Sequence, residues 1–373
     1  MAPIQTTHTG SLPRPPELAE LIVKFDHGEA TEPAELQRVV EQATRDVVKK
    51  QVDTGIDIVS DGEYSKVSYV TYVKERLTGF DGPPRSPIPR RRDQEEFPDW
   101  EGARPAAIQF PTNNAAVKLR DREAVRRDVA TFKAAAADAH PNGVFLTSAS
   151  PGVIDTFMPS VYYSSEREYL QALGEAMFDE YRTIVDSGCV LQIDCPDLAM
   201  SRTMRFGNLS DSEFIDTARM HLDVLAGLLS RLPADRLRLH LCWGNFEGPH
   251  NHDVPLSDII DMVLAMPVGG ISFEAANPRH AHEWQVFKRV RVPDSITLIP
   301  GVIDTVTNFV EHPDLVAERL LHFVDSVGAK RVIASTDCGF GTAVGMRRVP
   351  PSIAWAKLAA MVEGAQIASR AAA

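Results

Sequence analysis

The chain has 373 residues, of which 44% are hydrophobic and 24% are charged, and it carries a formal net charge of -12 at pH 7. This acidic balance excludes a broad nucleic-acid-binding surface, which needs basic residues to displace counterions, and no run approaches the roughly 18 apolar residues of a membrane span. Because the first residues also lack the basic start and apolar centre of a secretory signal, we expect a cytoplasmic protein whose four cysteines stay reduced.

Short apolar runs alternate with segments of helical period, which is typical of repeated β-α units. Strand candidates 3–11 and 56–63 come first, and the helical segments 15–25 and 33–52 lie between them. Six more strand candidates follow after residue 140, at 144–150, 190–196, 237–243, 270–275, 296–304 and 331–339. Helical stretches accompany them, such as 166–187, 211–231, 313–327 and 351–369, with Asp211 as a cap and Pro313 in a first turn. Eight such units without a GxGxxG turn predict one α/β domain over 1–373, a (β/α)8 TIM barrel rather than a doubly wound sheet.

The segment 79–118 interrupts this alternation and is rich in Pro, Gly and Arg. We interpret it as an insertion after the second strand. Its apolar-polar alternation from Arg104 to Leu119 predicts a hairpin, and the stretch 85–97 predicts a mobile loop or a lid over the barrel mouth.

Polar residues stand at nearly every predicted strand end, where TIM barrels carry their active sites. Among them are His240 and Cys242, which alternate on one strand and therefore point to the same side, and Glu274 and Cys338 on two later strands. These four are the commonest zinc-ligand types, and the chain has no Cys-x-x-Cys hook of a structural site. We expect them to hold a catalytic Zn²⁺, with Cys189 in the core and the role of Cys195 left open.

The donor set indicates the reaction. Two thiolates, one carboxylate and a neutral imidazole give a zinc site a formal charge of about -1, which makes a poor Lewis acid for hydrolysis. Such an ion still binds an incoming thiol as a nucleophilic thiolate, so alkylation of that sulfur is the expected chemistry. Glu274 is the ligand most easily exchanged for sulfur, and we predict that it moves when substrate binds.

These residues resemble the C-terminal catalytic barrel of cobalamin-independent methionine synthase, in the superfamily it shares with uroporphyrinogen decarboxylase. His240-Leu241-Cys242, the Glu274 strand end and Thr336-Asp337-Cys338-Gly339 are similar to its zinc-ligand motifs, and Thr9-Gly10-Ser11, Asp61-Gly62-Glu63 and Gln192-Ile193-Asp194 to its thiol-substrate segments. The resemblance implies methylation of homocysteine to methionine. It also implies that Glu63 and Asp194 bind the substrate ammonium group and that Ser11 meets the carboxylate.

The chain departs from that family in three ways. We expect it to act without the additional N-terminal barrel of the long synthases, which carries part of their folate surface, so the methyl or alkyl donor, folate or another, is left open. Asp304-Thr305-Val306 replaces the family's Asp-x-His element, so Asp304 is expected to orient or help protonate the departing group without the histidine. The longer loop 244–252 offers His250 or His252 as the missing proton donor, although exposed loop histidines are more often idle.

Two alternatives remain open. Epoxyalkane:coenzyme M transferases, short barrels of this superfamily, alkylate a thiol that bears a sulfonate; the cations available near strand ends for such a group are Arg14, Arg202, Arg205 and Arg279. Two carboxylates at Glu63 and Asp194 would repel a sulfonate, which favours an ammonium-bearing thiol. The other alternative is a zinc-binding protein without catalysis. A homo-oligomer is left open as well.

Overall fold

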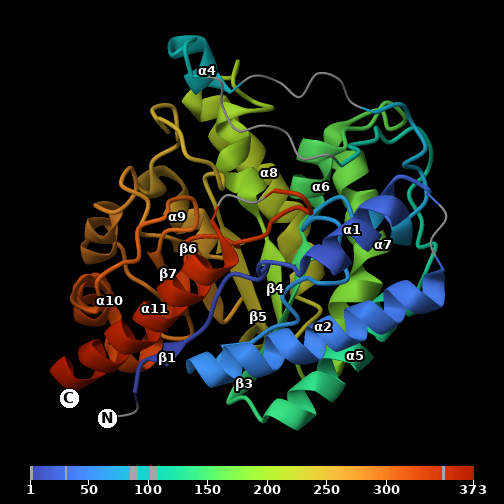
Figure 1. Cartoon of the computed structure of the whole chain (residues 1–373). Helices are drawn as coiled ribbons and strands as arrows, with labels where there is room; N and C mark the ends of the chain where they lie inside the picture. The colour runs from blue at the N-terminus through green and yellow to red at the C-terminus, as the bar shows by residue number, and fades with distance from the viewer. Residues whose placement is uncertain (1–2, 30–31, 85–90, 101–107, 347–348) are drawn as a thin grey trace.

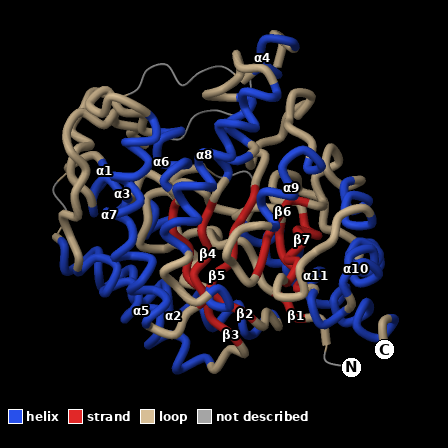
Figure 2. The backbone as a smooth tube through the Cα atoms, turned by 180° about the vertical axis from the view of Figure 1, so that it is seen from behind, coloured by secondary structure: helices blue, strands red, loops and turns tan. Residues whose placement is uncertain are grey.

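Eight parallel strands form the centre of the molecule, and helices surround them (Figure 1, Figure 2). The computed structural model describes residues 3–29, 32–84, 91–100, 108–346 and 349–373. Hydrogen-bonded neighbours follow the order β1-β8-β7-β6-β5-β4-β3-β2. The strands are β1 (Gln5–Thr6), β2 (Ile58–Val59), β3 (Gly143–Ala149), β4 (Val190–Asp194), β5 (Leu237–Leu241), β6 (Gly270–Glu274), β7 (Thr297–Ile303) and β8 (Ile333–Thr336). The predicted TIM barrel is confirmed.

The barrel closes between β1 and β2 through single hydrogen bonds rather than a strand ladder. The Asp57 N–H donates to the Thr6 carbonyl at 3.2 Å, and the Thr7 hydroxyl donates to the Ile58 carbonyl at 2.9 Å. On the other side of β1, the Thr9 N–H donates to the Thr336 hydroxyl at 3.2 Å. The Thr7 N–H still donates to the Ala334 carbonyl at 2.8 Å, but at Thr9 a side chain replaces the backbone partner, and the predicted strand 3–11 shortens to two residues.

The helices predicted from helical period all form. In chain order the described helices are α1 (Pro16–Asp26), α2 (Pro33–Thr54), α3 (Val73–Arg76), α4 (Arg92–Glu96), α5 (Glu123–Ala139), α6 (Pro151–Phe157), α7 (Glu166–Asp186), α8 (Asp211–Leu229), α9 (Leu256–Leu264), α10 (Pro313–Val327) and α11 (Pro351–Ala371). The predicted cap of α8 was wrong by one residue, because Ser210 accepts from the Glu213 N–H and Asp211 is the first helical residue. None of the described helices has the length and apolar character needed to cross a membrane.

The two ends of the 79–118 segment pair with each other. Antiparallel bridges join Leu77 to Leu119 and Pro84 to Pro111. The hairpin expected over 104–119 and the loop or lid expected over 85–97 both fall partly outside the described residues, on 101–107 and 85–90. The described helix α4 lies at the upper end of the barrel in Figure 1 and packs on the loop that follows β5, where Asp93 accepts from the Asn251 N–H at 3.0 Å.

Candidate functional site

The ends of β5 and β8 bring three of the expected metal ligands together. His240 and Cys242 alternate along the β5 end, and Cys338 follows β8. One donor atom from each lies within 4.8 Å of the other two, and all three residues are buried. The Cys242 and Cys338 sulfurs are 3.8 Å apart. The His240 Nδ1 is buried without a hydrogen-bond partner among the described residues. The arrangement is a compact N, S, S donor group.

The electrostatics of this group fit a divalent cation. Burial, together with the nearby Arg238 charge, lowers the pKa of His240 to about 3, so the imidazole is neutral and keeps a lone pair for a metal. The hydrogen bond with Cys338, burial and the negative charges of Cys338 and Glu274 raise the pKa of Cys242 well above its ordinary value. A metal ion would supply the positive charge that both thiols need to ionise.

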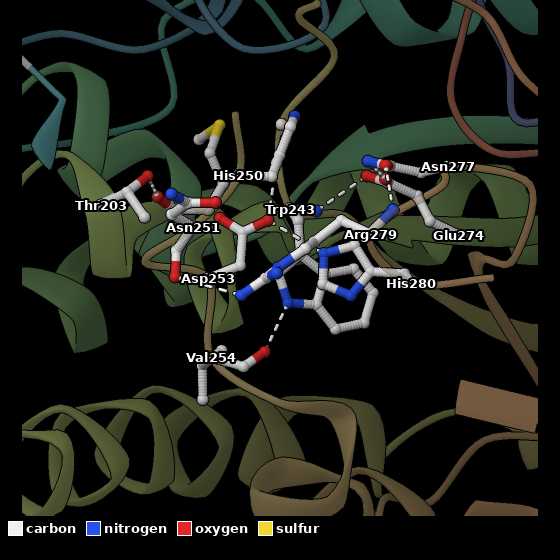
Figure 3. A network of polar contacts seen from close by, with 12 residues as sticks. Thr203, Trp243, His250, Asn251, Asp253, Val254, Glu274, Asn277, Arg279 and His280 are labelled. Carbon is white, nitrogen blue, oxygen red and sulfur yellow. Dashed lines mark hydrogen bonds and ion pairs between the residues drawn. The ribbon is translucent and has the colours of Figure 1, made fainter. Parts of the chain in front are cut away.

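Glu274 lies beside this group without belonging to it. Its Oε1 accepts the Trp243 N–H at 2.8 Å, and its Oε2 accepts the Asn277 side-chain amide at 3.1 Å (Figure 3). The turn that carries Asn277 is held by Asp337, whose carboxylate accepts three successive backbone N–H groups, those of residues 275–277. Glu274 therefore adjoins Cys242, as its effect on that thiol indicates, and its ligation and movement remain predictions.

The residues expected to bind the substrate ammonium form a second buried cluster. Asp194 ends β4, and Glu63 follows β2 in a left-handed conformation with φ of 60°. Burial and the charge of Glu63 raise the pKa of Asp194 to about 8. Glu63 Oε1 accepts the Thr147 hydroxyl at 2.9 Å, whereas its buried Oε2 has no partner in the described part of the chain. Lys66 and Arg238 already act on Asp194 as positive charges, yet its pKa stays raised and Glu63 Oε2 stays without a partner among the described residues, which favours a further cation at these two carboxylates.

A relay from the barrel interior orients Asp194. The Arg238 guanidinium donates to Gln192 Oε1 at 2.8 Å, and the Gln192 amide donates to Asp194 Oδ1 at 2.7 Å. These two hydrogen bonds fix the orientation of the Gln192 side-chain amide, so that its N–H group points to the Asp194 carboxylate.

Ser11 lies against the loop that follows Cys338. Its carbonyl accepts the Phe340 N–H at 2.8 Å, and its hydroxyl accepts the Gly341 N–H at 3.4 Å. A Cβ on Gly339 would stand 2.0 Å from the Ser11 hydroxyl oxygen. Only glycine therefore permits this approach, and Ser11 comes to lie near the thiol pair as a consequence.

The two candidate proton donors are engaged elsewhere in the fold. The Asp304 carboxylate accepts the Val306 N–H at 3.0 Å, the Thr307 N–H at 2.9 Å and the Thr307 hydroxyl, which is the pattern of a local turn. His250 is buried rather than exposed, and it stacks on Phe246 with ring centroids 4.1 Å apart. Their catalytic roles stay predictions.

Asp253 connects His250 to a second buried histidine. Its Oδ2 accepts from His250 Nδ1 at 2.6 Å and from His280 Nε2 at 2.9 Å, and His280 stacks on Trp243 (Figure 3). The other nitrogen of His250 faces the Phe246 carbonyl at 3.1 Å. The hydrogen bonds of His250 thus hold the loop after β5 in one conformation. His252, which lies 2.7 Å from Glu96, is also paired.

The cations proposed for a sulfonate are used by the protein itself. Arg14 donates to three backbone carbonyls, and Arg202 and Arg205 form ion pairs with carboxylates at 2.7 and 2.6 Å. The exposed Arg279 donates to a loop carbonyl at 3.3 Å.

Sequence reasoning missed two polar groups at the barrel mouth. Burial raises the pKa of Tyr69 well above its ordinary value, and the charges of Cys242, Cys338 and Asp194 add to the effect. Burial lowers the pKa of Arg91 to about 10, although the negative charges of Asp253, Tyr69 and Cys242 act to raise it. Neither residue stands at a strand end, so strand-end polarity gives no signal for them.

Comparisons with known proteins agree with this fold. The family model described as "Cobalamin-independent synthase, Catalytic domain" matches residues 4–85 and 151–367. A methionine synthase of Saccharolobus islandicus is 23% identical over 372 residues, covering 98% of this chain and 94% of that protein. A B12-independent methionine synthase from Shewanella sp. W3-18-1, solved in complex with selenomethionine, is similar in fold, with a TM-score of 0.77 at 20% identity over 99% of both chains. A putative vitamin-B12-independent methionine synthase from Listeria monocytogenes gives a TM-score of 0.66 at 18% identity over 98% of both chains.

Proposed function

The chain belongs to the cobalamin-independent methionine synthase catalytic-domain family, and from this premise we propose that it transfers a methyl or other alkyl group to a thiol with the help of zinc. The acceptor is most simply homocysteine. The observation that carries the proposal is the buried group of His240, Cys242 and Cys338, whose donor atoms lie within 4.8 Å of one another.

Two thiolates and a neutral imidazole are soft donors that suit zinc. A zinc ion held there would let the substrate thiol ionise at neutral pH, where a free thiol with a pKa of about 8.5 is mostly protonated. His240 contributes a ring nitrogen and the cysteines contribute their sulfurs. Glu274, whose carboxylate adjoins Cys242, is the proposed fourth ligand and yields its place to the substrate.

The polar groups of the amino-acid substrate would bind to residues at the same barrel mouth. Its ammonium group binds between Glu63 Oε2, which has no partner among the described residues, and the Asp194 carboxylate. Its carboxylate faces Ser11 and the glycine-rich loop 339–341. The selenomethionine in the Shewanella relative is an amino acid of the kind this arrangement would take.

The proposed transfer is a nucleophilic substitution at carbon, in which atoms and electrons balance. The substrate sulfur supplies the electron pair for the new sulfur–carbon bond, the bond from that carbon to the leaving group breaks, and the leaving group departs with its pair. A poor leaving group also needs a proton. Asp304 would orient the departing group from the end of β7. A sulfonate thiol fits less well, because Glu63 and Asp194 would repel it and the nearby arginines are engaged.

Zinc content and alkyl transfer, measured together, test the proposal. Purified protein should hold about one zinc per chain and methylate or alkylate homocysteine, and Cys242→Ser and Cys338→Ser should lose both properties. Cys189→Ser is the matched control, because Cys189 is equally buried but outside the donor group. Full zinc content in the Cys242 and Cys338 variants would refute the assigned site, and zinc without any transfer would leave a zinc-binding protein.

A further inference from the structure

The segment that interrupts the barrel brings a guanidinium group to the thiol site. We propose that Arg91, with the Tyr69 hydroxyl, forms a subsite for an anionic group on the alkyl donor, so that the donor's reactive carbon lies beside the thiol pair. This inference rests on the proposed function and deepens it, because it names the chemical class of the second substrate.

Two contacts fix Arg91 in this position. Its guanidinium carbon lies 3.9 Å from the centroid of the Phe246 ring, and its Nη1 donates to the Thr203 hydroxyl at 3.1 Å. A guanidinium that is stacked and hydrogen-bonded in this way has its remaining donors aligned before a ligand arrives.

Both partners of Arg91 belong to segments bonded to Cys242. The loop that carries Phe246 begins at Gly244, whose N–H donates to the Cys242 sulfur at 3.2 Å. The short helix η2 (Met200–Thr203) begins at Met200, whose N–H donates to the Cys242 carbonyl at 3.1 Å. Arg91 is therefore held over the part of the chain that presents the thiol.

The charge of Arg91 is not paired within the described part of the chain. Asp253 and Asp93 both act on it through space, yet neither forms an ion pair with it. Asp253 receives hydrogen bonds from His250 and His280 on Oδ2, and Asp93 receives one from a backbone N–H on Oδ1, while the other oxygen of each carboxylate is buried without a hydrogen-bond partner among the described residues. Arg91 is partly buried, and a partly desolvated guanidinium without a carboxylate partner favours an anionic ligand.

Tyr69 supplies a hydroxyl that is influenced by the charges of both clusters. Its backbone N–H donates to the Thr342 carbonyl at 3.1 Å, and its ring packs edge-on against Phe157 at 6.1 Å between centroids, so its position is set. The groups whose charges act on its hydroxyl are those of the thiol pair, Asp194 and Arg91. The Tyr69 hydroxyl is therefore close enough to both the thiol pair and Arg91 to feel their charges, and we infer that it serves the same ligand.

The family model covers the residues assigned to the thiol substrate but not Arg91. The residues assigned to the metal and to the amino-acid thiol all lie within the matched ranges 4–85 and 151–367, whereas Arg91 lies between those ranges. The thiol substrate's ammonium and carboxylate also have partners of their own, in Glu63, Asp194 and Ser11. Arg91 thus lies outside the part of the barrel that the family model covers, and the substrate left for it to bind is the donor.

A pair of alkylating probes that differ in charge tests the subsite. Zinc-loaded protein and homocysteine are mixed with bromoacetate or with bromoacetamide, where the sulfur–carbon bond forms, bromide leaves with its electron pair, and the thiol proton passes to the buffer. Arg91→Gln should lower kcat/KM for bromoacetate about 10- to 100-fold, the loss expected for one charge-assisted hydrogen bond, and leave bromoacetamide within about twofold. Arg91→Lys should retain most of the preference.

The neighbouring Arg92→Gln is the matched control, because Arg92 is the first residue of helix α4, directly after the N-cap Arg91, but makes neither contact of Arg91. Intact mass identifies any alkylation of the protein's own cysteines, and thermal melting identifies a misfolded variant. A second measurement does not depend on turnover: the fluorine NMR line of fluoroacetate, but not that of fluoroacetamide, should broaden with the native protein and sharpen in Arg91→Gln.

The outcomes distinguish this inference from the function on which it rests. Equal broadening of fluoroacetate by native protein and Arg91→Gln, or equal bromoacetate rates in the two, overturns the subsite even if thiol alkylation is catalysed. Broadening that depends on Arg91 without any acceleration supports the anion subsite and counts against the proposed transfer.

Discussion

The facing carboxylates of Glu63 and Asp194 predict that amino-acid binding depends on pH. Burial and the charge of Glu63 raise the pKa of Asp194 to about 8, so its carboxyl is largely protonated at neutral pH before a ligand binds. A bound ammonium group favours the ionised form and lowers that pKa. Binding therefore releases a proton below about pH 8, and affinity rises with pH until the carboxyl is ionised in the free protein as well.

The magnitude follows from the size of the shift. If only ionised Asp194 accepts the ammonium, the apparent dissociation constant rises about tenfold for each pH unit below the pKa, which makes binding about 50-fold weaker near pH 6 than near pH 8. Calorimetric titration with methionine measures this, since a thioether has no thiol proton to complicate the result. Buffers of different ionisation enthalpy should report release of close to one proton at about pH 6.5.

Two variants separate the causes of this pH dependence. Asp194→Asn should bind methionine weakly at every pH and release no proton. Glu63→Gln should bind it more weakly too, but with the midpoint at lower pH, because the negative charge that helps to raise the pKa of Asp194 is gone. Affinity that is constant from about pH 6 to about pH 8, with heats independent of buffer, would refute the reasoning.

Two further predictions concern stability and close approach. Glu180→Ala removes one of the two carboxylates paired with buried Arg76, at 2.7 Å, and also the acceptor of the buried Tyr72 and Ser148 hydroxyls. It should lower the free energy of unfolding in urea by about 3–5 kcal/mol, whereas Glu175→Ala, at an exposed pair, should cost under about 1 kcal/mol; equal losses would contradict the role of burial. Gly339→Ala places a Cβ 2.0 Å from the buried Ser11 hydroxyl oxygen and should weaken methionine binding at least about tenfold. The control Gly227→Ala, with open space around its Cβ, should bind methionine normally. Unchanged affinity in the Gly339 variant would show that the loop adapts.

The sequence predicts the scaffold well because strand and helix periods are local signals. All eight strand positions and the six helices expected from periodicity form. The convergence of His240, Cys242 and Cys338 also follows from the sequence, since parallel strands of a barrel end at one mouth. The cap of α8 was misplaced because Ser210 and Asp211 are both good cap residues, and only the geometry, with Glu213 closing the capping box, distinguishes them.

The remainder depends on contacts between distant segments. The burial of His250 rests on Phe246 and Asp253, and the loop sequence alone gives no signal for it. The turn held by Asp304 is local, and the hydroxyl and backbone donors two and three residues later are a signal that could have been recognised in the sequence. The position of Arg91 is set by the docking of the insertion on the loop after β5, which no periodicity in the segment encodes.

The sulfur count at zinc tests the central claim most directly. Zinc-edge absorption spectroscopy of zinc-loaded protein should find about two sulfur neighbours, from Cys242 and Cys338, and a third when homocysteine is added. Homoserine, which has oxygen in place of that sulfur, should leave the count unchanged. An unchanged sulfur count with saturating homocysteine would contradict the proposal that this barrel activates a thiol at its metal centre.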